Sequence, residues 1–339
     1  MHILLITACH PYFGGWYRTD NIARQLTTLG HTVRFIHNRK YHRNLIVRLL
    51  IGLKNCWWII RGGYDRVHIF ELIPPETLLP GLLARLLNKK VVIDLGDQWG
   101  IPPPRGVWGS WVGIYLQFLD AVLARHYGWL TATSDFLAEK IRLAVPTKKG
   151  QILKLINGVN LSEFNPLDKE YCRFKLSFDS KSKILLSFGN TYEGERFRLL
   201  QEVCQHVIDY IPDIKFFNNR YLNKEELPLY LGACDLVLFP TGGADNEKAC
   251  FPIRVGTYLN GERVIATDNS PTEFHNTLKP FNCMITGKNP REIAQNIHRF
   301  FTDRVYREEL EYNVFTAKRE LSWENLIGGL DEFYKAMEI

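Results

Sequence analysis

The class of fold is decided by the first 36 residues, MHILLITACHPYFGGWYRTDNIARQLTTLGHTVRFI (1–36). A short apolar run at 2–7 is followed by a loop with two glycines. Apolar residues then recur at helical spacing from Asp20 to Leu29, and VRFIH (33–37) alternates like a strand. A strand, a helix and a strand in this order form a βαβ unit, which implies parallel pairing. We therefore predict an α/β protein.

The rest of the chain repeats this alternation. Strands are predicted at 66–70, 90–96, 130–133 and 151–156, and a second series at 183–189, 214–219, 235–240 and 263–268. Between these strands, apolar residues recur at helical spacing, which predicts a helix after most of them. The sequence thus predicts two Rossmann-like, doubly wound domains that face a cleft, with residues 1–165 in the first and 166–322 in the second. A ligand is expected at the C-terminal ends of the strands.

Composition narrows the class of protein. The chain has 339 residues, of which 46% are hydrophobic and 23% charged, so it can bury a sizeable core. Seven cysteines form no CxxC pair, which disfavours a zinc module or a disulfide scaffold. No apolar run reaches 18 residues, and the N-terminus lacks the basic region of a signal peptide. We expect a reduced, cytoplasmic protein.

The charge is distributed unevenly. The net charge is +6, but residues 1–165 carry +10 and residues 166–339 carry −4. The basic half suits an anionic partner. Within it, segment 39–61 mixes Lys and Arg with Leu, Ile, Trp57 and Trp58, a composition that can lie in an anionic membrane surface. The alternative is a core-facing helix with a basic outer face. The membrane interpretation would make the protein peripheral on the inner face of the membrane.

Several loops could bind an anion. Gly14 and Gly15 follow the first strand and precede a helix whose N–H groups are available. Pro252 predicts a helix start, with Lys248 and Arg254 beside it. Arg196 follows another strand, although an arginine beside glutamates is more often in a surface ion pair. The absence of GxGxxG disfavours a nicotinamide-dependent oxidoreductase, and the absence of HExxH and DxD disfavours a metal site.

The end of the strand KVVIDLGDQW places Asp94 and Asp97 at the edge of the first sheet where α/β proteins carry chemistry. A carboxylate there can orient or deprotonate an acceptor hydroxyl. The alternative is an aspartate that caps the next loop.

Together these motifs resemble a family, the retaining glycosyltransferases of the GT-B fold, in the family-four-like group that includes sucrose synthase and bacterial mannosyltransferases. The resemblance is carried by the opening βαβ unit, by YDRVHIF…KVVIDLGDQW, by TATSDFLAEKI…ILKLINGVNLSEFNP, by ELPLYLGACDLVLFPT and by SWENL. It covers most of the chain. It also implies that a C-terminal helix at 323–339 crosses back to the first domain.

The resemblance implies a nucleotide-sugar donor in the second domain, an acceptor in the first, and no metal or cofactor. The implied reaction moves a hexose, with UDP-glucose as first choice, to a glycan or lipid-linked glycan hydroxyl with retention, in polysaccharide biosynthesis. No nucleic-acid partner is implied. The implied substrate-binding residues are Gly14, Gly15, Asn190, Arg196, Lys248, Ala249, Cys250, Phe251, Arg254 and Thr257, and Asp97 is the implied catalytic residue.

The chain departs from the family pattern at its E-x7-E motif. Thr257 stands where the second Glu is expected, and Ala249 stands where the first is expected. Gly96 takes the place of the family's His, which leaves Asp97, and Asn190 replaces an Arg. These departures support an alternative function, a non-catalytic nucleotide-sugar-binding partner of another transferase.

Overall fold

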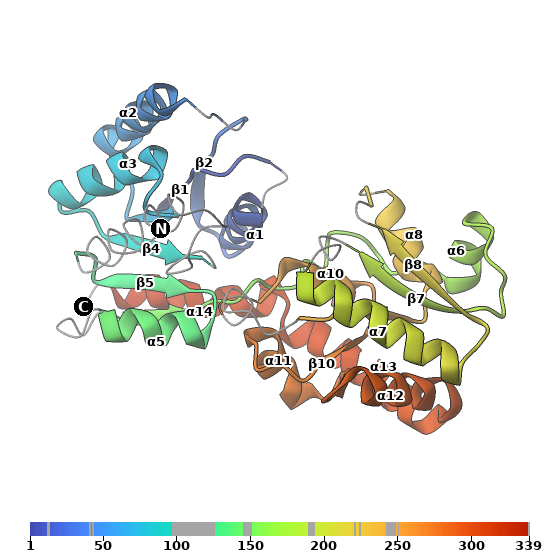
Figure 1. Ribbon diagram of the computed structural model, residues 1–339. Helices are drawn as coiled ribbons and strands as arrows, with labels where there is room; N and C mark the ends of the chain where they lie inside the picture. Colours follow the sequence, from blue (N-terminus) through green and yellow to red (C-terminus); the bar gives the residue numbers. More distant parts are fainter. Residues whose placement is uncertain are drawn as a thin grey trace. The chain divides into compact units, whose positions relative to one another are not determined.

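The structure is a computed structural model that describes residues 1–11, 14–40, 42, 44–96, 126–144, 151–188, 194–219, 222–223, 225–241, 249 and 251–337. Its contacts divide the chain into two compact units (Figure 1). The first unit comprises Met1–Asn157 together with Trp323–Ile339, and the second comprises Gly158–Ser322. The division falls before residue 165 because residues 158–165 bond within the second unit. There Val159 N donates to Leu321 O, and Asn260 Nδ2 donates to Phe164 O.

The first unit is built on a six-stranded parallel sheet in the order β2-β1-β3-β4-β5-β6. Its strands are β1 (His2–Thr7), β2 (Thr32–Ile36), β3 (Arg66–Phe70), β4 (Val91–Leu95), β5 (Trp129–Ala132) and β6 (Gln151–Lys154). Its helices are α1 (Gly14–Thr28), α2 (Leu45–Arg61), α3 (Pro75–Leu86), α5 (Asp135–Ala144) and α14 (Trp323–Ala336). The central strands read as continuous apolar runs because helices cover both faces of the sheet.

One core cluster joins the sheet to α1 and α14. Ile3 and Leu5 of β1 point toward this face, where Ile22 of α1 and Trp323 and Leu330 of α14 pack against them, all nearly inaccessible to solvent. Successive residues of a strand point to opposite faces, so Leu4 and Ile6 are buried on the other face. The helix α14 therefore completes the first unit although it follows the second unit in the sequence.

The second unit has a five-stranded parallel sheet in the order β11-β10-β9-β7-β8. Its strands are β7 (Lys183–Phe188), β8 (Ile214–Asn219), β9 (Leu236–Leu238), β10 (Val264–Asp268) and β11 (Met284–Gly287). Its helices are α6 (Lys169–Lys175), α7 (Gly194–Tyr210), α8 (Glu226–Ala233), α10 (Ile253–Asn260), α11 (Glu273–Leu278), α12 (Pro290–Thr302) and α13 (Arg304–Glu320), with a short 3-10 turn at Lys279–Phe281. In both sheets the strand order reverses beside the first strand of the unit, which creates the crevice where α/β proteins bind ligands.

The predicted α/β class with parallel sheets is confirmed. One helix boundary was wrong. We predicted that the first helix begins at Asp20, but α1 begins at Gly14, so the glycine pair forms its first turn rather than the preceding loop. The hydroxyl of Thr19, in the next turn, donates to Gly15 O at 2.7 Å. The prediction started too late because the buried apolar residues of α1 begin only at Ile22.

None of the helices in the described ranges is both long enough and apolar enough to cross a membrane.

Candidate functional site

In the second unit, α10 brings an arginine to the C-terminal end of β7. Arg254 Nη1 donates to Phe188 O, the last carbonyl of that strand, at 3.3 Å, and the Tyr258 hydroxyl lies 3.4 Å from the same oxygen. The Arg254 guanidinium also lies 5.7 Å from the ring centroid of Phe239, just after β9. Arg254 is half-buried and Phe239 is buried. A backbone acceptor and an aromatic face therefore hold this cation at the edge where a ligand is expected.

A second arginine reaches the same sheet edge from α7. Arg196, in the first turn of the helix, donates from Nε to Thr241 O at 3.1 Å. Thr241 follows β9 and is buried. The structure thus positions Arg196 and Arg254 on carbonyls at or just beyond the C-terminal ends of neighbouring strands of one sheet. Two guanidinium groups at the C-terminal edge of a parallel sheet can bind the charge of a diphosphate.

Beside them, at the end of β10, the Asp268 carboxylate is the shared acceptor of several hydrogen bonds. It accepts from Thr241 N at 2.6 Å, from the Thr241 hydroxyl at 3.0 Å and from the Ser270 hydroxyl. Burial alone would raise the pKa of Asp268, but the hydrogen bonds from Ser270 and Thr241 outweigh it and lower that pKa. Asp268 therefore stays ionised and fixes the Thr241 backbone that in turn holds Arg196. We did not predict this residue, although an acid that ends an apolar strand is a readable signal.

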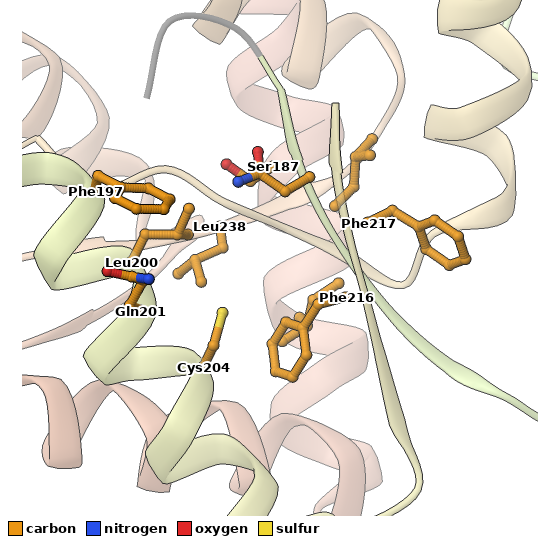
Figure 2. A pocket seen from close by; sticks show the side chains of 11 residues that line it. Ser187, Phe197, Leu200, Gln201, Cys204, Phe216, Phe217 and Leu238 are labelled. Carbon is orange, nitrogen blue, oxygen red and sulfur yellow. The ribbon is translucent and has the colours of Figure 1, made fainter. Parts of the chain in front are cut away.

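An apolar cavity of about 220 Å³ lies between α7 and the strands β7 and β8. Phe197, Leu200, Gln201 and Cys204 of α7 line one side of it, and Ser187 of β7 faces it from the sheet (Figure 2). The Ser187 hydroxyl is buried and has no hydrogen-bond partner within the described ranges. Among the described residues that line the cavity none is charged, so it suits an apolar or aromatic group rather than a phosphate.

The other predicted residues of the second unit divide into two groups. Asn190, Lys248 and Cys250 lie outside the described residues. Ala249, Phe251 and Thr257 lie in or beside α10 with buried side chains. Neither Thr257 nor Ala249 carries the carboxylate of the E-x7-E motif, and the side chains of α10 that reach the Phe188 carbonyl are those of Arg254 and Tyr258. The structure therefore places Arg196 and Arg254 at this edge, and the acid described beside them, Asp268, accepts hydrogen bonds from Thr241 and Ser270.

In the first unit, Gly14 and Gly15 lie where α1 begins, opposite the end of β3. A side chain at Gly15 would place its Cβ 2.7 Å from Cys9 Sγ and 2.9 Å from Glu71 Oε1. The Cys9 thiol donates to Glu71 Oε1 at 3.1 Å, and burial together with the Glu71 charge raises the Cys9 pKa to about 12. Gly15 is thus required for close packing within the unit. Glu71, with a positive φ of 63°, was not predicted as a site residue.

The candidate acid Asp94 has a structural partner. Arg18 binds it through Nη2 to Oδ1 at 2.8 Å and Nε to Oδ2 at 3.1 Å, and the Thr131 hydroxyl donates to Oδ1 at 2.5 Å. Burial raises the pKa of Asp94, but the Arg18 charge and hydrogen bonds outweigh that and lower it. Arg18 also donates to Leu155 O at 2.8 Å. Asp94 is therefore a buried acid whose charged form is favoured by its pairing with Arg18, and the predicted catalytic residue Asp97 lies outside the described residues.

No group of three or more His, Cys, Asp or Glu side chains with metal-ligand geometry occurs within the described ranges. The charged groups found at the edge of the second sheet are instead arginines and a hydrogen-bonded aspartate.

Solved structures share this architecture along the whole chain. Sucrose-phosphate synthase from Thermosynechococcus elongatus matches with a TM-score of 0.67 and 13% identity, covering 100% of this chain and 99% of that chain. Anabaena HepE in complex with UDP and glucose matches with a TM-score of 0.61 and 13% identity over 99% of both chains. UDP-GlcNAc 2-epimerase from Neisseria meningitidis bound to UDP-GlcNAc matches with a TM-score of 0.54 and 11% identity over 100% of both.

The chain has the GT-B fold. Its two parallel α/β units match the two-domain arrangement of these proteins. No protein-family model and no curated protein sequence matches it.

Proposed function

We propose that the chain is a retaining, metal-independent glycosyltransferase that moves a hexose from a nucleoside-diphosphate sugar to a hydroxyl of a glycan or lipid-linked glycan in polysaccharide biosynthesis. UDP-glucose is our first choice of donor. The observation that carries the proposal is the pair of guanidinium groups, Arg196 and Arg254, anchored at the C-terminal edge of the second sheet. The GT-B fold supports it, and HepE of that fold has been solved with UDP-glucose.

In the proposed reaction the two arginines bind the donor diphosphate, and Lys248 and Asn190 add contacts that only the sequence suggests. The bond between the anomeric carbon and the phosphate oxygen breaks, and the acceptor oxygen bonds to the same face of that carbon. The acceptor proton passes to the departing phosphate oxygen. Arginines lower the barrier because they stabilise the negative charge that develops on the diphosphate. Asp97 is proposed to orient the acceptor hydroxyl, and the start of α1 at Gly14 to offer N–H groups.

The donor class is tested first by ligand-induced stabilisation. A ligand that binds only the folded state raises the melting temperature. We expect UDP and UDP-glucose, without added metal, to raise it more than GDP, ADP and their sugars. No shift with any nucleotide would contradict the proposal.

The arginine pair is tested by substitution. In Arg254→Ala we expect the Kd of UDP-glucose to rise by roughly tenfold or more, since hydrogen bonds to charged groups contribute about 1.5–3 kcal/mol. Arg304→Ala is the matched control, because Arg304 is highly exposed and pairs with Glu308 on α13. Isothermal titration measures both, and equal effects of the two substitutions would argue against a diphosphate site at Arg254.

Two further functions compete with transfer. Thr257 and Ala249, which replace the family's glutamates, favour a nucleotide-sugar-binding partner that lacks activity. The epimerase among the structural matches favours a UDP-sugar epimerase. Saturable release of UDP from UDP-glucose, with a glycosylated product of retained anomeric configuration, supports the transferase. Binding without turnover supports the first alternative, and acceptor-independent isomerisation of UDP-GlcNAc supports the second.

A further inference from the structure

The helix α2 is amphipathic in the reverse of the usual sense. Its buried residues are Gly52, Asn55 and Ile59, and the helix packs against α3. A Cβ at Gly52 would lie 2.3 Å from the Pro75 carbonyl oxygen, and Asn55 Nδ2 donates to Glu76 O at 3.0 Å. The side that packs against the protein is therefore made largely of small and polar groups.

The outward side of α2 is apolar along its length. Six side chains recur every three or four residues and are between 38 and 67% exposed. This apolar stripe consists of Ile46, Leu49, Leu50, Leu53, Trp57 and Ile60. Single exposed apolar residues need no explanation, but a continuous apolar helix face in water marks an interaction surface.

Positive charge flanks the apolar stripe. Lys54 and Arg61 are exposed and follow the stripe on the helix surface, one position after Leu53 and Ile60. Arg34 of β2 is held nearby, because its guanidinium lies 4.0 Å from the ring centroid of Trp58. Residues 21–64 contain eight Lys and Arg and no Asp or Glu. Of the basic residues of α2, Arg48 is already neutralised by Glu76 at 2.7 Å.

We propose that the apolar stripe docks this protein on an anionic lipid bilayer, with α2 lying in the plane of the headgroups. Leu and Ile enter the acyl boundary, Trp57 lies at the level of the headgroups, and Lys54 and Arg61 pair with lipid phosphates. The positive charge of α2 favours an anionic bilayer over a second copy of the chain as the partner of the apolar stripe. In a two-fold dimer, the same cationic helix would face itself with no acidic residue on it to compensate. An anionic bilayer supplies both the apolar phase and the opposite charge.

The proposal is independent of sugar transfer. It predicts binding by the full-length chain to vesicles in the absence of any nucleotide. Vesicle flotation compares vesicles of phosphatidylcholine alone with vesicles of equal parts phosphatidylcholine and phosphatidylglycerol. We expect binding to the anionic vesicles, with an affinity that falls as salt rises, and little binding to the neutral ones.

Two variants separate the apolar and the ionic contributions. In Leu50→Gln/Leu53→Gln/Trp57→Gln we expect the partition coefficient to fall by more than about tenfold, because the buried side chains drive insertion. In Lys54→Gln/Arg61→Gln we expect a loss of roughly fivefold for each cation removed. All five side chains are at the surface, so circular dichroism and melting should stay unchanged. Leu143→Gln is the matched control, since Leu143 is a 72% exposed residue of α5 outside the stripe.

The result that would overturn the proposal is unchanged vesicle binding in the triple variant, or no vesicle binding by the native chain. Light scattering measures the oligomeric state of the native chain and of the triple variant. A concentration-dependent dimer that disappears in the triple variant would assign the apolar stripe to a second copy and would also overturn it. Because no nucleotide is present, these results are distinguishable from a failure of the transferase proposal.

Discussion

Arg18 joins three segments of the first unit through one buried guanidinium. It pairs with Asp94 and donates to Leu155 O, Ile156 O and the Asn157 side chain, where the first unit ends. Lysine cannot reproduce this fork of donors. In Arg18→Lys we expect the free energy of unfolding to fall by about 3 kcal/mol, measured by urea denaturation. Arg24→Lys, in a surface pair with Asp20, should change it by less than about 1 kcal/mol, and equal effects would contradict the assigned role.

Glycine is required at position 15 by the atoms that surround it, and not by its backbone conformation. The position gives no positive φ, yet a methyl group would collide with Cys9 Sγ and Glu71 Oε1. We expect Gly15→Ala to destabilise the protein by about 1–3 kcal/mol. Shortening the neighbour in Gly15→Ala/Cys9→Ala should recover part of the loss. If the double variant recovers nothing in thermal denaturation, the clash with the thiol is not the cause.

Two adjacent glycines of α14, unlike Gly15, have room for a side chain. Gly328 and Gly329 are exposed within the helix, and a Cβ at either position would meet nothing within 4 Å. Glycine lowers helix stability relative to alanine. We therefore expect Gly328→Ala to stabilise the first unit by about 0.5–1 kcal/mol, seen as a higher melting temperature. A decrease would show that an unseen contact occupies this side of α14.

The same helix is fixed to β3 by polar contacts that cross the core. Arg66 donates through Nε and Nη2 to Tyr334 O, at 2.9 and 2.7 Å, and the Tyr334 hydroxyl lies 2.6 Å from His68 Nδ1. Both side chains of β3 are buried. These contacts specify which face of α14 meets the sheet, a choice that apolar packing alone leaves less sharply defined.

Each unit contains a buried histidine with a lowered pKa, which makes that unit less stable in acid. Burial lowers the pKa of His68 to about 3, and burial also lowers that of His275. The unfolded chain binds these protons near pH 6.5 and the folded chain binds them only at lower pH, so stability is lost as pH falls below about 6.5. For His68 we expect a loss of roughly 1 kcal/mol per pH unit between pH 6 and 4, and for His275 a loss in the same direction.

Urea unfolding at several pH values measures this slope. Asp94 and Asp268 have lowered pKa values, so the stability they contribute is fully present above about pH 4 and is lost only as the pH falls below that value. In His68→Gln/His275→Gln the slope between pH 6 and 4 should flatten. A slope equal to that of the native chain would mean that other groups cause the acid loss.

The alternation of apolar runs and helical spacing was enough to predict the parallel sheets, because buried parallel strands are apolar throughout. It was not enough to identify the contacts at the sheet edges. Glu71 and Asp268 act through partners that are distant in the sequence, and no local pattern shows those partners. For α2, periodicity revealed an apolar side but not which side the protein covers. The structure buries Gly52, Asn55 and Ile59 and leaves the apolar stripe exposed.

The insertion of the second unit between α14 and the rest of the first has a consequence for synthesis on the ribosome. Residues 158–322 are contiguous, so the second unit can fold as soon as it leaves the exit tunnel. The first unit must wait for α14, and until then the face formed by Ile3, Leu5 and Ile22 lacks the cover of Trp323 and Leu330. A released chain that ends at residue 322 should therefore expose part of that face to chaperones and proteases, while its second unit is already folded and resistant.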